Sequence, residues 1–308
     1  PPAKSEGGNT SDWMYNTTGT TIRSRTNSLT FTSGSADASG TDFGVFVEHP
    51  QSEPVKKVDK TRIASYADGT LEYTIQAAVP KVGTDVIDAI DSFSIEDLLD
   101  NRLKDVEVKG VYTTDSEDAN PGVAEWTKLS GTQYTIDTTG NRLKVDINKI
   151  LLGYKQFKVV FVVKTQSHDL MADTSIINNQ AISHSDDVPS KSNVVRTQPT
   201  LMYDHEFKSE DGSELPQDVK TLTPASTEDI TPGTTVTPNL FSVPEASKPN
   251  ATYNGYDAGK VQVKDDTKNG VWSFKSWDKA NETLDKKNGH FIGTWAFTPN
   301  AYAQTYKY

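Results

Sequence analysis

The sequence predicts an all-β protein that combines an antiparallel β-sandwich with a second, small and mainly β domain. Short runs of alternating or β-branched residues recur along the chain, bounded by turn residues such as ADGT, NPGV and TTGN. Hydrophobic residues make up only 34%, which is typical of sandwiches with thin cores and wide polar faces. Cysteine is absent, which excludes disulfides and thiolate metal sites. The clearest runs are LEYTIQAAV, KDVEVKGVY, RLKVDINKI and FKVVFVVKT.

The length of the chain limits the number of domains, and its net charge limits the classes of partner that it can bind. The 308 residues are enough for two or three domains, and the net charge is -11. Because an acidic surface repels nucleic acid and anionic membranes, we expect neither as a partner. No run of about 18 apolar residues occurs, and the start PPAKSEGG lacks the zones of a signal peptide. These features indicate a mature or trimmed ectodomain, or a cytosolic protein.

Shifts in composition predict four segments along the chain. Residues 1–50 are rich in Thr, Ser, Gly and Asn, and we expect a strand segment there, either a docked hairpin or the tail of an upstream domain. A sandwich domain follows over 51–198, and its last residues form a polar, proline-flanked linker that ends near 199. A second domain covers 200–299. The ending AYAQTYKY, at the start of a fresh aromatic strand, predicts a following repeat from 300–308 onward.

One stretch, residues 84–103, is ambiguous between helix and strand. Its apolar residues approach a period of 3.6, so its first half is the one serious helix candidate in the chain.

Alternating aromatic residues predict the core of the second domain. Two strand-like segments, GVWSFKSWDK and GTWAFTPN, place large aromatic residues on one face. We expect four of these five to fill one small core: Trp272, Phe274, Trp277, Trp295 and Phe297.

Familiar catalytic and cofactor motifs are missing from the sequence. No nucleophile elbow, zinc-protease, phosphate-loop or dinucleotide-binding pattern occurs, so we expect no cofactor and no enzyme activity on a substrate. The histidines are scattered, and we interpret all five as surface residues: His49, His168, His184, His205 and His290.

Three polar residue types in apolar surroundings indicate a different chemistry. An opening strand carries Lys56 and Lys57, a later segment carries Asp97, and the stretch IINNQAIS carries Asn179. Burial favours a neutral lysine and a protonated carboxylic acid. A neutral amine is a nucleophile, and a neutral acid polarises an amide by hydrogen bonding. If buried together, these residues form an intramolecular isopeptide bond and release ammonia.

The order of these segments resembles the isopeptide-forming fimbrial domains of Gram-positive pilins and adhesins, which are related to the A-type domain of collagen adhesins. The resemblance covers residues 51–198 and implies that Asp97 is the acid and Asn179 the acceptor of the bond. For the lysine we prefer Lys56 to Lys57, because Val58 then follows at the inward position where the family has a valine. In the alternative interpretation both lysines are solvated and Asn179 hydrogen-bonds a loop.

The C-terminal third resembles the streptococcal high-identity tandem repeat, the SHIRT domain, over residues 200–299. The shared features are LP after an opening strand, then G-x-W-x-F-x-x-W, then G-x-W-x-F. The chain departs from the family in a long segment, SKPNATYNGYDAGKVQVKDDTK, and in Ser276, where the family has glycine.

Together the resemblances imply a monomeric, extracellular and wall-anchored adhesin fragment. The cross-linked sandwich and the stalk repeat would form a mechanically stable, rod-like support. This support would present a binding region to a host extracellular-matrix protein or a surface glycan. Two alternatives remain: a carbohydrate-binding accessory module of a secreted enzyme, and direct binding of collagen or fibronectin by the sandwich.

Overall fold

The computed structural model divides the chain into two compact units. Unit 1 comprises residues 1–60, 70–164 and 178–196, and unit 2 comprises 61–69, 165–177 and 197–308. The structure describes residues 53–79, 90–151, 153–186, 188–243, 251–253 and 262–301. The predicted segment 1–50, and the following repeat beyond residue 301, lie outside the described residues. The expected domain limits near 50 and 199 stay predictions.

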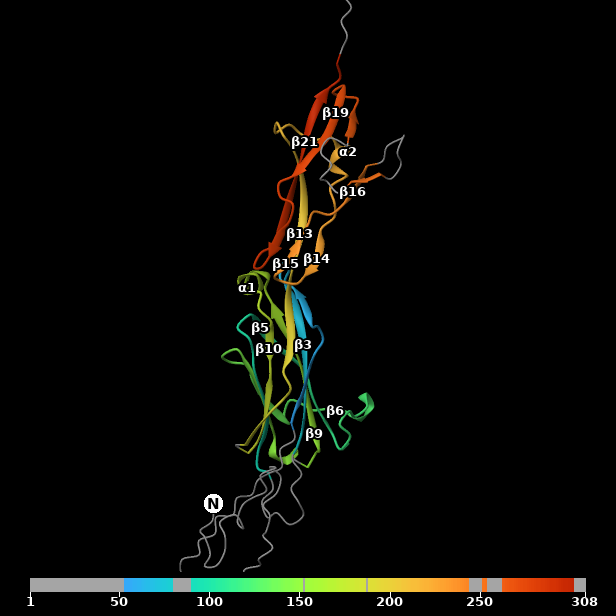
Figure 1. The fold of residues 1–308 in the computed structure, drawn as a ribbon. Helices are drawn as coiled ribbons and strands as arrows, with labels where there is room; N and C mark the ends of the chain where they lie inside the picture. The colour runs from blue at the N-terminus through green and yellow to red at the C-terminus, as the bar shows by residue number, and fades with distance from the viewer. Residues whose placement is uncertain are drawn as a thin grey trace, which may run out of the picture. The chain divides into compact units, whose positions relative to one another are not determined.

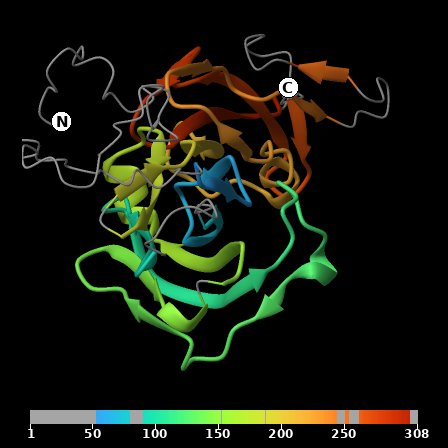
Figure 2. The same ribbon diagram turned by 90° about the horizontal axis from the view of Figure 1, so that it is seen from below.

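Unit 1 contains two five-stranded sheets (Figures 1 and 2). The first has the order β1-β3-β9-β5-β6, with the bounds Val55–Val58, Gly69–Ala78, Gln156–Thr165, Leu103–Thr114 and Thr127–Lys128. The second has the order β12-β11-β4-β8-β7, with the bounds Val188–Lys191, Ala181–Ser185, Phe93–Leu98, Arg142–Ile147 and Tyr134–Asp137. Neighbouring strands of the second sheet are all antiparallel. Short 3-10 helices lie at Val123–Glu125 and Lys149–Leu151.

Alternation along the strands explains why the two sheets of unit 1 pack face to face. In β3, Leu71, Tyr73 and Ile75 are buried at every second position. Phe93 of the second sheet contacts Phe157 of the first, with ring centroids 5.6 Å apart. The predicted antiparallel sandwich is therefore confirmed for unit 1.

The ambiguous stretch 84–103 forms a strand in its described second half. β4 lies between β11 and β8, and both neighbours bond to its backbone. Phe93, Ile95 and Asp97 point inward, whereas Leu98 is 62% exposed. Pairing on both sides overrides the helical spacing of the apolar residues. The helix candidate of the first half lies largely outside the described residues.

Unit 2 is built on one mixed sheet. Its main path is β10-β13-β21-β19-β18, with the bounds Ile177–Asn179, Val195–Ser209, Gly289–Pro299, Gly270–Trp277 and Gln262–Asp265; Asn178 and Asn179 of β10 are counted in unit 1. β13 also pairs with β14 (Thr227–Ile230) and β2 (Arg62–Ala64). β13 runs parallel to β21, and β19 runs antiparallel to β21.

The remaining elements are short. β15 (Thr234–Val236) pairs with β20 (Glu282–Leu284), and β16 (Phe241–Val243) pairs with β17 (Ala251–Tyr253). Two helices, α1 (Ser167–Ala172) and α2 (Gln217–Lys220), lie in the same unit. In the described part of the chain, no helix has the length and apolar character that crossing a membrane requires.

Aromatic rings fill the core of unit 2, as the alternation predicts. Trp272, Phe274, Trp277 and Trp295 are buried in one cluster, and Phe297 packs against it partly buried. Gly293, two residues before Trp295, makes room for this packing, because a Cβ at that position would lie 2.7 Å from a ring carbon of Phe207. The glycine of the G-x-W-x-F pattern is therefore required by the ring beneath it.

The interpretation of every histidine as a surface residue is wrong for His205. This side chain lies among aromatic rings, with centroids 5.4 Å from Trp277 and 5.8 Å from Phe291. Its Nε2 accepts a hydrogen bond from the backbone N–H of Asn239 at 2.9 Å. Because burial penalises the imidazolium, the pKa of His205 lies below its usual value. The sequence did not indicate this burial, because His205 lies between two acidic residues in the run YDHEFK, a composition that is also typical of an exposed edge strand.

We predict that Trp295→Ala unfolds the core of unit 2 and leaves unit 1 folded. Truncating a large buried aromatic residue costs about 3 to 5 kcal/mol, and a domain of this size is stable by about 5 to 15 kcal/mol. Calorimetry should therefore show one transition lost or strongly shifted and the other unchanged. Trp126→Ala, a partly exposed tryptophan of unit 1, is the control and should leave the transition of unit 2 in place.

We also predict that acid destabilises unit 2 through His205. The unfolded chain binds a proton near the ordinary pKa of 6.5, whereas the folded chain resists it, so stability falls as the pH drops below 6.5. His205→Phe should flatten the fall between about pH 7.5 and 5.5, although it weakens the fold by removing the bond from Asn239. The pKa of His290 is raised by its hydrogen bond to Asp204, so its effect on stability runs the other way: it stabilises the fold at low pH, and this contribution is lost as the pH rises. An equally steep acid loss in His205→Phe would contradict the assignment.

Candidate functional site

Lys56 lies on the inward face of β1, the edge strand of the first sheet. The burial of β1 alternates so that Val55 and Lys57 are exposed and Lys56 is only 1% exposed. This is the reverse of an ordinary amphipathic strand, because the lysine takes the core position and the valine the surface. The Nζ atom lies 4.7 Å from the ring centroid of Tyr73 and 5.9 Å from that of Phe161.

Asp97 and Asn179 reach the same region from other strands. Asp97 is an inward residue of β4 and pairs across the strands with Ala181 of β11. Asn179 precedes Ala181 by two residues, and residues two apart on an extended chain share a face. Asp97 is 1% exposed and Asn179 is 2% exposed, whereas its neighbour Asn178 points outward.

The structure thus brings together the three predicted residues Lys56, Asp97 and Asn179, and it leaves Lys57 at the surface. Lys56 Nζ donates a hydrogen bond to Asp97 Oδ2, and both side chains are fully buried. This contact joins the two sheets across the core of the sandwich.

Burial dominates the electrostatics of this pair. It lowers the pKa of Lys56 to about 8, against the opposing effect of the nearby Asp97 carboxylate. It raises the pKa of Asp97 to about 6, against the opposing effects of Lys56 and of the Asn179 amide. Both shifts favour the neutral form of each group, which is the protonation state in which an amine is nucleophilic and a carboxyl group donates.

Several polar atoms of the site are left without hydrogen bonds. Asp97 Oδ1 and both amide atoms of Asn179 are buried and make no hydrogen bond of normal geometry. A buried polar group without a partner costs about 1 to 3 kcal/mol. The arrangement therefore lowers the free energy of unfolding of the sandwich, and a reaction that removes the amide nitrogen would relieve part of this penalty.

A clamp that the sequence did not reveal holds the strands of the site. The backbone N–H of Lys56 donates to Asn193 Oδ1 at 2.8 Å, and Asn193 Nδ2 donates to the Lys56 carbonyl at 2.9 Å. The adjacent Ser192 makes two hydrogen bonds with Ala181, which lies two residues after Asn179. The backbone N–H of Ala181 donates to Ser192 Oγ, and the backbone N–H of Ser192 donates to the Ala181 carbonyl. The open edge of β1 is thus closed by one side chain, which mimics a neighbouring strand. In the sequence, the one signal for this clamp is the asparagine in the run SKSNVV, because an amide side chain can both donate to and accept from a backbone.

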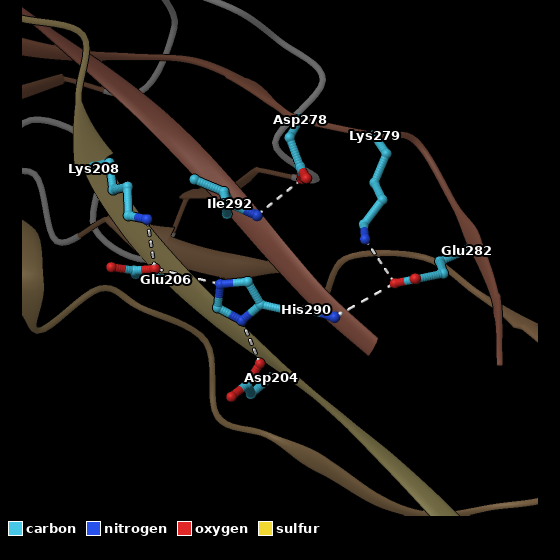
Figure 3. A network of polar contacts seen from close by, with 8 residues as sticks. All are labelled: Asp204, Glu206, Lys208, Asp278, Lys279, Glu282, His290 and Ile292. Carbon is cyan, nitrogen blue, oxygen red and sulfur yellow. Dashed lines mark hydrogen bonds and ion pairs between the residues drawn. The ribbon is translucent and has the colours of Figure 1, made fainter. Parts of the chain in front are cut away.

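A second polar cluster lies on unit 2 and is exposed (Figure 3). His290 of β21 contacts Asp204 at 2.6 Å and Glu206 at 3.3 Å on the parallel neighbour β13. Exposed contacts of this kind typically contribute 0 to about 1 kcal/mol, and they mark strand pairing rather than chemistry. Among the described residues, no group of His, Asp and Glu side chains has an arrangement that could hold a metal ion.

Two family models match the chain. The Sgo0707 N2 domain matches residues 51–198, and the SHIRT domain matches residues 201–298. A search of curated protein sequences found no match.

Solved structures of both kinds are similar to the chain. The N-terminal domain of the Streptococcus gordonii adhesin Sgo0707 is 22% identical, covering 48% of this chain and 32% of that one, with a TM-score of 0.40. SHIRT domain 10 from a cell surface protein is 37% identical, covering 33% of this chain and 100% of that one, with a TM-score of 0.25. Domains D2 and D3 of the Corynebacterium diphtheriae major pilin SpaD are 25% identical, covering 51% and 56%, with a TM-score of 0.39.

The chain therefore spans about a third of the Sgo0707 structure and the whole of the SHIRT structure. The two resemblances noted in the sequence agree with the families that the models match. Residues 51–198 therefore correspond to the Sgo0707 N2 domain family, and residues 201–298 correspond to the SHIRT domain family.

Proposed function

We propose that the chain is the load-bearing part of an extracellular, wall-anchored adhesin, in which Lys56 and Asn179 form an intramolecular isopeptide bond. The similar solved structures come from an adhesin and from a cell surface protein, which supports the extracellular location. One observation carries the proposal: a lysine, an acid and an amide are buried together, and the lysine donates a hydrogen bond to the acid. We also propose that the chain acts as a monomer; the bond forms within one chain and needs no second copy.

The proposed reaction needs only these three side chains. Neutral Lys56 Nζ attacks the Asn179 side-chain carbon Cγ, while protonated Asp97 donates a hydrogen bond to Asn179 Oδ1. Asp97 then relays a proton from Nζ to Nδ2, the Cγ–Nδ2 bond breaks, and ammonia leaves. One C–N bond replaces another, and Asp97 ends protonated as it began.

Burial lowers the energetic cost of reaching the reactive state. It lowers the pKa of Lys56 and raises the pKa of Asp97, so the neutral amine and the neutral acid lie closer in free energy to the ion pair than they would in water. A reaction that occurs once in the lifetime of the protein tolerates a reactive state that is only a minor fraction of the population.

The bond would give the sandwich mechanical resistance. It closes a loop of roughly 120 residues, and the loop-entropy rule for cross-links gives a stabilisation of about 5 kcal/mol. Under tension, force would pass from β1 to β10 through the side chains and bypass everything between them. The SHIRT repeat would then act as a spacer that presents the adhesin away from the cell.

Exposed aromatic side chains on a sheet face would favour the alternative of a carbohydrate-binding accessory module. In the described part of the chain, Trp272, Trp277 and Trp295 are buried core residues, so they form no aromatic platform. The burial of these three tryptophans favours a role of this domain as a stalk over a role in binding carbohydrate.

We predict that the intact chain weighs less than its sequence by the mass of one ammonia. Asp97→Ala should restore the full mass, because the acid that polarises the amide and relays the proton is gone, and Lys56→Arg should do the same. Lys57→Arg, on the outward face of the same strand, is the matched control and should keep the loss. Intact mass spectrometry decides, and an unmodified wild-type mass would contradict the proposal.

A further prediction concerns extension under force. In single-molecule pulling, the wild-type chain should release no length from residues between Lys56 and Asn179. Asp97→Ala should release an additional length of about 400 Å, the reach of roughly 120 extended residues. Equal total lengths in both chains would show that the load does not run through the bond.

A further inference from the structure

The outer face of the first sheet in unit 1 carries a pocket of about 240 Å³. It lies over β1, β3 and β9 and beneath the connection from β5 to β6. The lining side chains that matter for recognition are those of Val55, Lys57, Gln76, Asn120, Trp126 and Lys158. The volume suits one sugar ring rather than a drug-sized ligand.

Two glutamines, the half-buried Gln76 and the buried Gln156, hold the wall of the pocket in place. Gln76 Nε2 donates to Gln156 Oε1 at 2.7 Å and to the carbonyl of Ala119 at 3.0 Å. Gln156 Nε2 donates to the carbonyls of Ser116 and Asp118, both at 2.8 Å. These bonds fasten the connecting loop onto the sheet beside Asn120, so the pocket is preformed. They also occupy the amide nitrogen of Gln76 and leave its oxygen as an acceptor on the wall.

Two lysines in the pocket have no carboxylate partner among the described residues. Lys158 Nζ lies 4.1 Å from the ring centroid of Trp126 and 5.0 Å from that of Tyr112, and no ion pair with an acidic side chain competes for it. Lys57 likewise makes no ion pair and points to the same pocket from β1. The lining of the pocket includes these two lysines and no acidic residue, which is a local excess of positive charge in a chain of net charge -11.

We propose that this pocket binds the carboxylate of an acidic sugar. Lys57 and Lys158 would receive the carboxylate in charge-assisted hydrogen bonds. The Gln76 oxygen and the Asn120 amide would meet ring hydroxyl groups, since an amide offers both donors and acceptors. Trp126 and Val55 supply the apolar walls against which the carbon face of a sugar packs.

The pocket lies on the other face of the strand that carries Lys56. Lys57 and Val55 face the ligand, whereas Lys56 between them faces the core. A ligand that pulls on β1 would therefore load a strand anchored by the proposed cross-link. The inference refines the ligand of the proposed adhesin, but binding itself needs only the folded sandwich.

The experiment is an isothermal titration of the full chain with 3′-sialyllactose, with a hyaluronan tetrasaccharide and with neutral lactose. We expect saturable binding of at least one acidic sugar and none of lactose, and the two acidic arms distinguish a terminal acid from an acid within a chain. Lys158→Gln and Trp126→Ala should each weaken binding by about tenfold or more, the value of one charge-assisted bond. Lys128→Gln, a lysine of β6 outside the pocket, is the matched control and should bind as the wild type does.

The outcomes that overturn the proposal are equally specific. Equal binding of lactose, no binding of either acidic sugar, or tighter binding of a glutamate-rich peptide would each reject an acidic-sugar site. Intact mass and thermal unfolding of each variant show whether its sandwich is folded and cross-linked. A chain that loses ammonia but binds no sugar refutes the pocket alone, and a chain that binds sugar at full mass refutes the cross-link alone.

Discussion

The burial of Lys56 against Asp97 is the constraint on which the sandwich depends. Two groups that are charged in water lie in a core of Tyr73, Phe161 and neighbouring apolar residues, where each loses its hydration. Breaking such a pair by removing one partner typically costs 3 to 5 kcal/mol, and keeping it gains little over apolar residues of the same size. A selective advantage other than noncovalent stability is needed, and the proposed covalent closure of the sandwich would supply one.

Strand β1 combines several roles in four residues. Its inward face carries the buried Lys56, and its outward face carries Lys57 and part of the pocket wall. Its free edge is occupied by the side-chain amide of Asn193, which bonds both the N–H and the carbonyl of Lys56. An edge strand is normally the first strand to separate from a sheet. The Asn193 clamp closes this edge, and the proposed cross-link at Lys56 would strengthen the same strand.

The two units solve the problem of stability in different ways. Unit 1 uses polar groups buried at one place, whereas unit 2 has a cluster of aromatic rings with centroids mostly 5 to 6 Å apart, such as Phe207 with Trp295 at 5.4 Å. Ring pairs add about 0.5 to 1.5 kcal/mol each beyond the area they bury. The same tight packing explains why Gly293 tolerates no side chain and why a neutral imidazole, His205, can replace a phenyl ring inside it.

The sequence by itself determined the all-β class, the alternating aromatic core of unit 2 and both family resemblances. The class and the core depend on residue type and on spacing along single strands, where side chains alternate with a period of two. The roles proposed for Lys56, Asp97 and Asn179 came from the family resemblance and from the chemistry of the three residue types. Tertiary structure alone decided that segment 93–98 is a central strand, that His205 is buried, that Asn193 clamps Lys56 and that two lysines meet Trp126 in one pocket. Each of these joins residues far apart in the chain, and such contacts arise from strand pairing between distant segments, which no local pattern encodes.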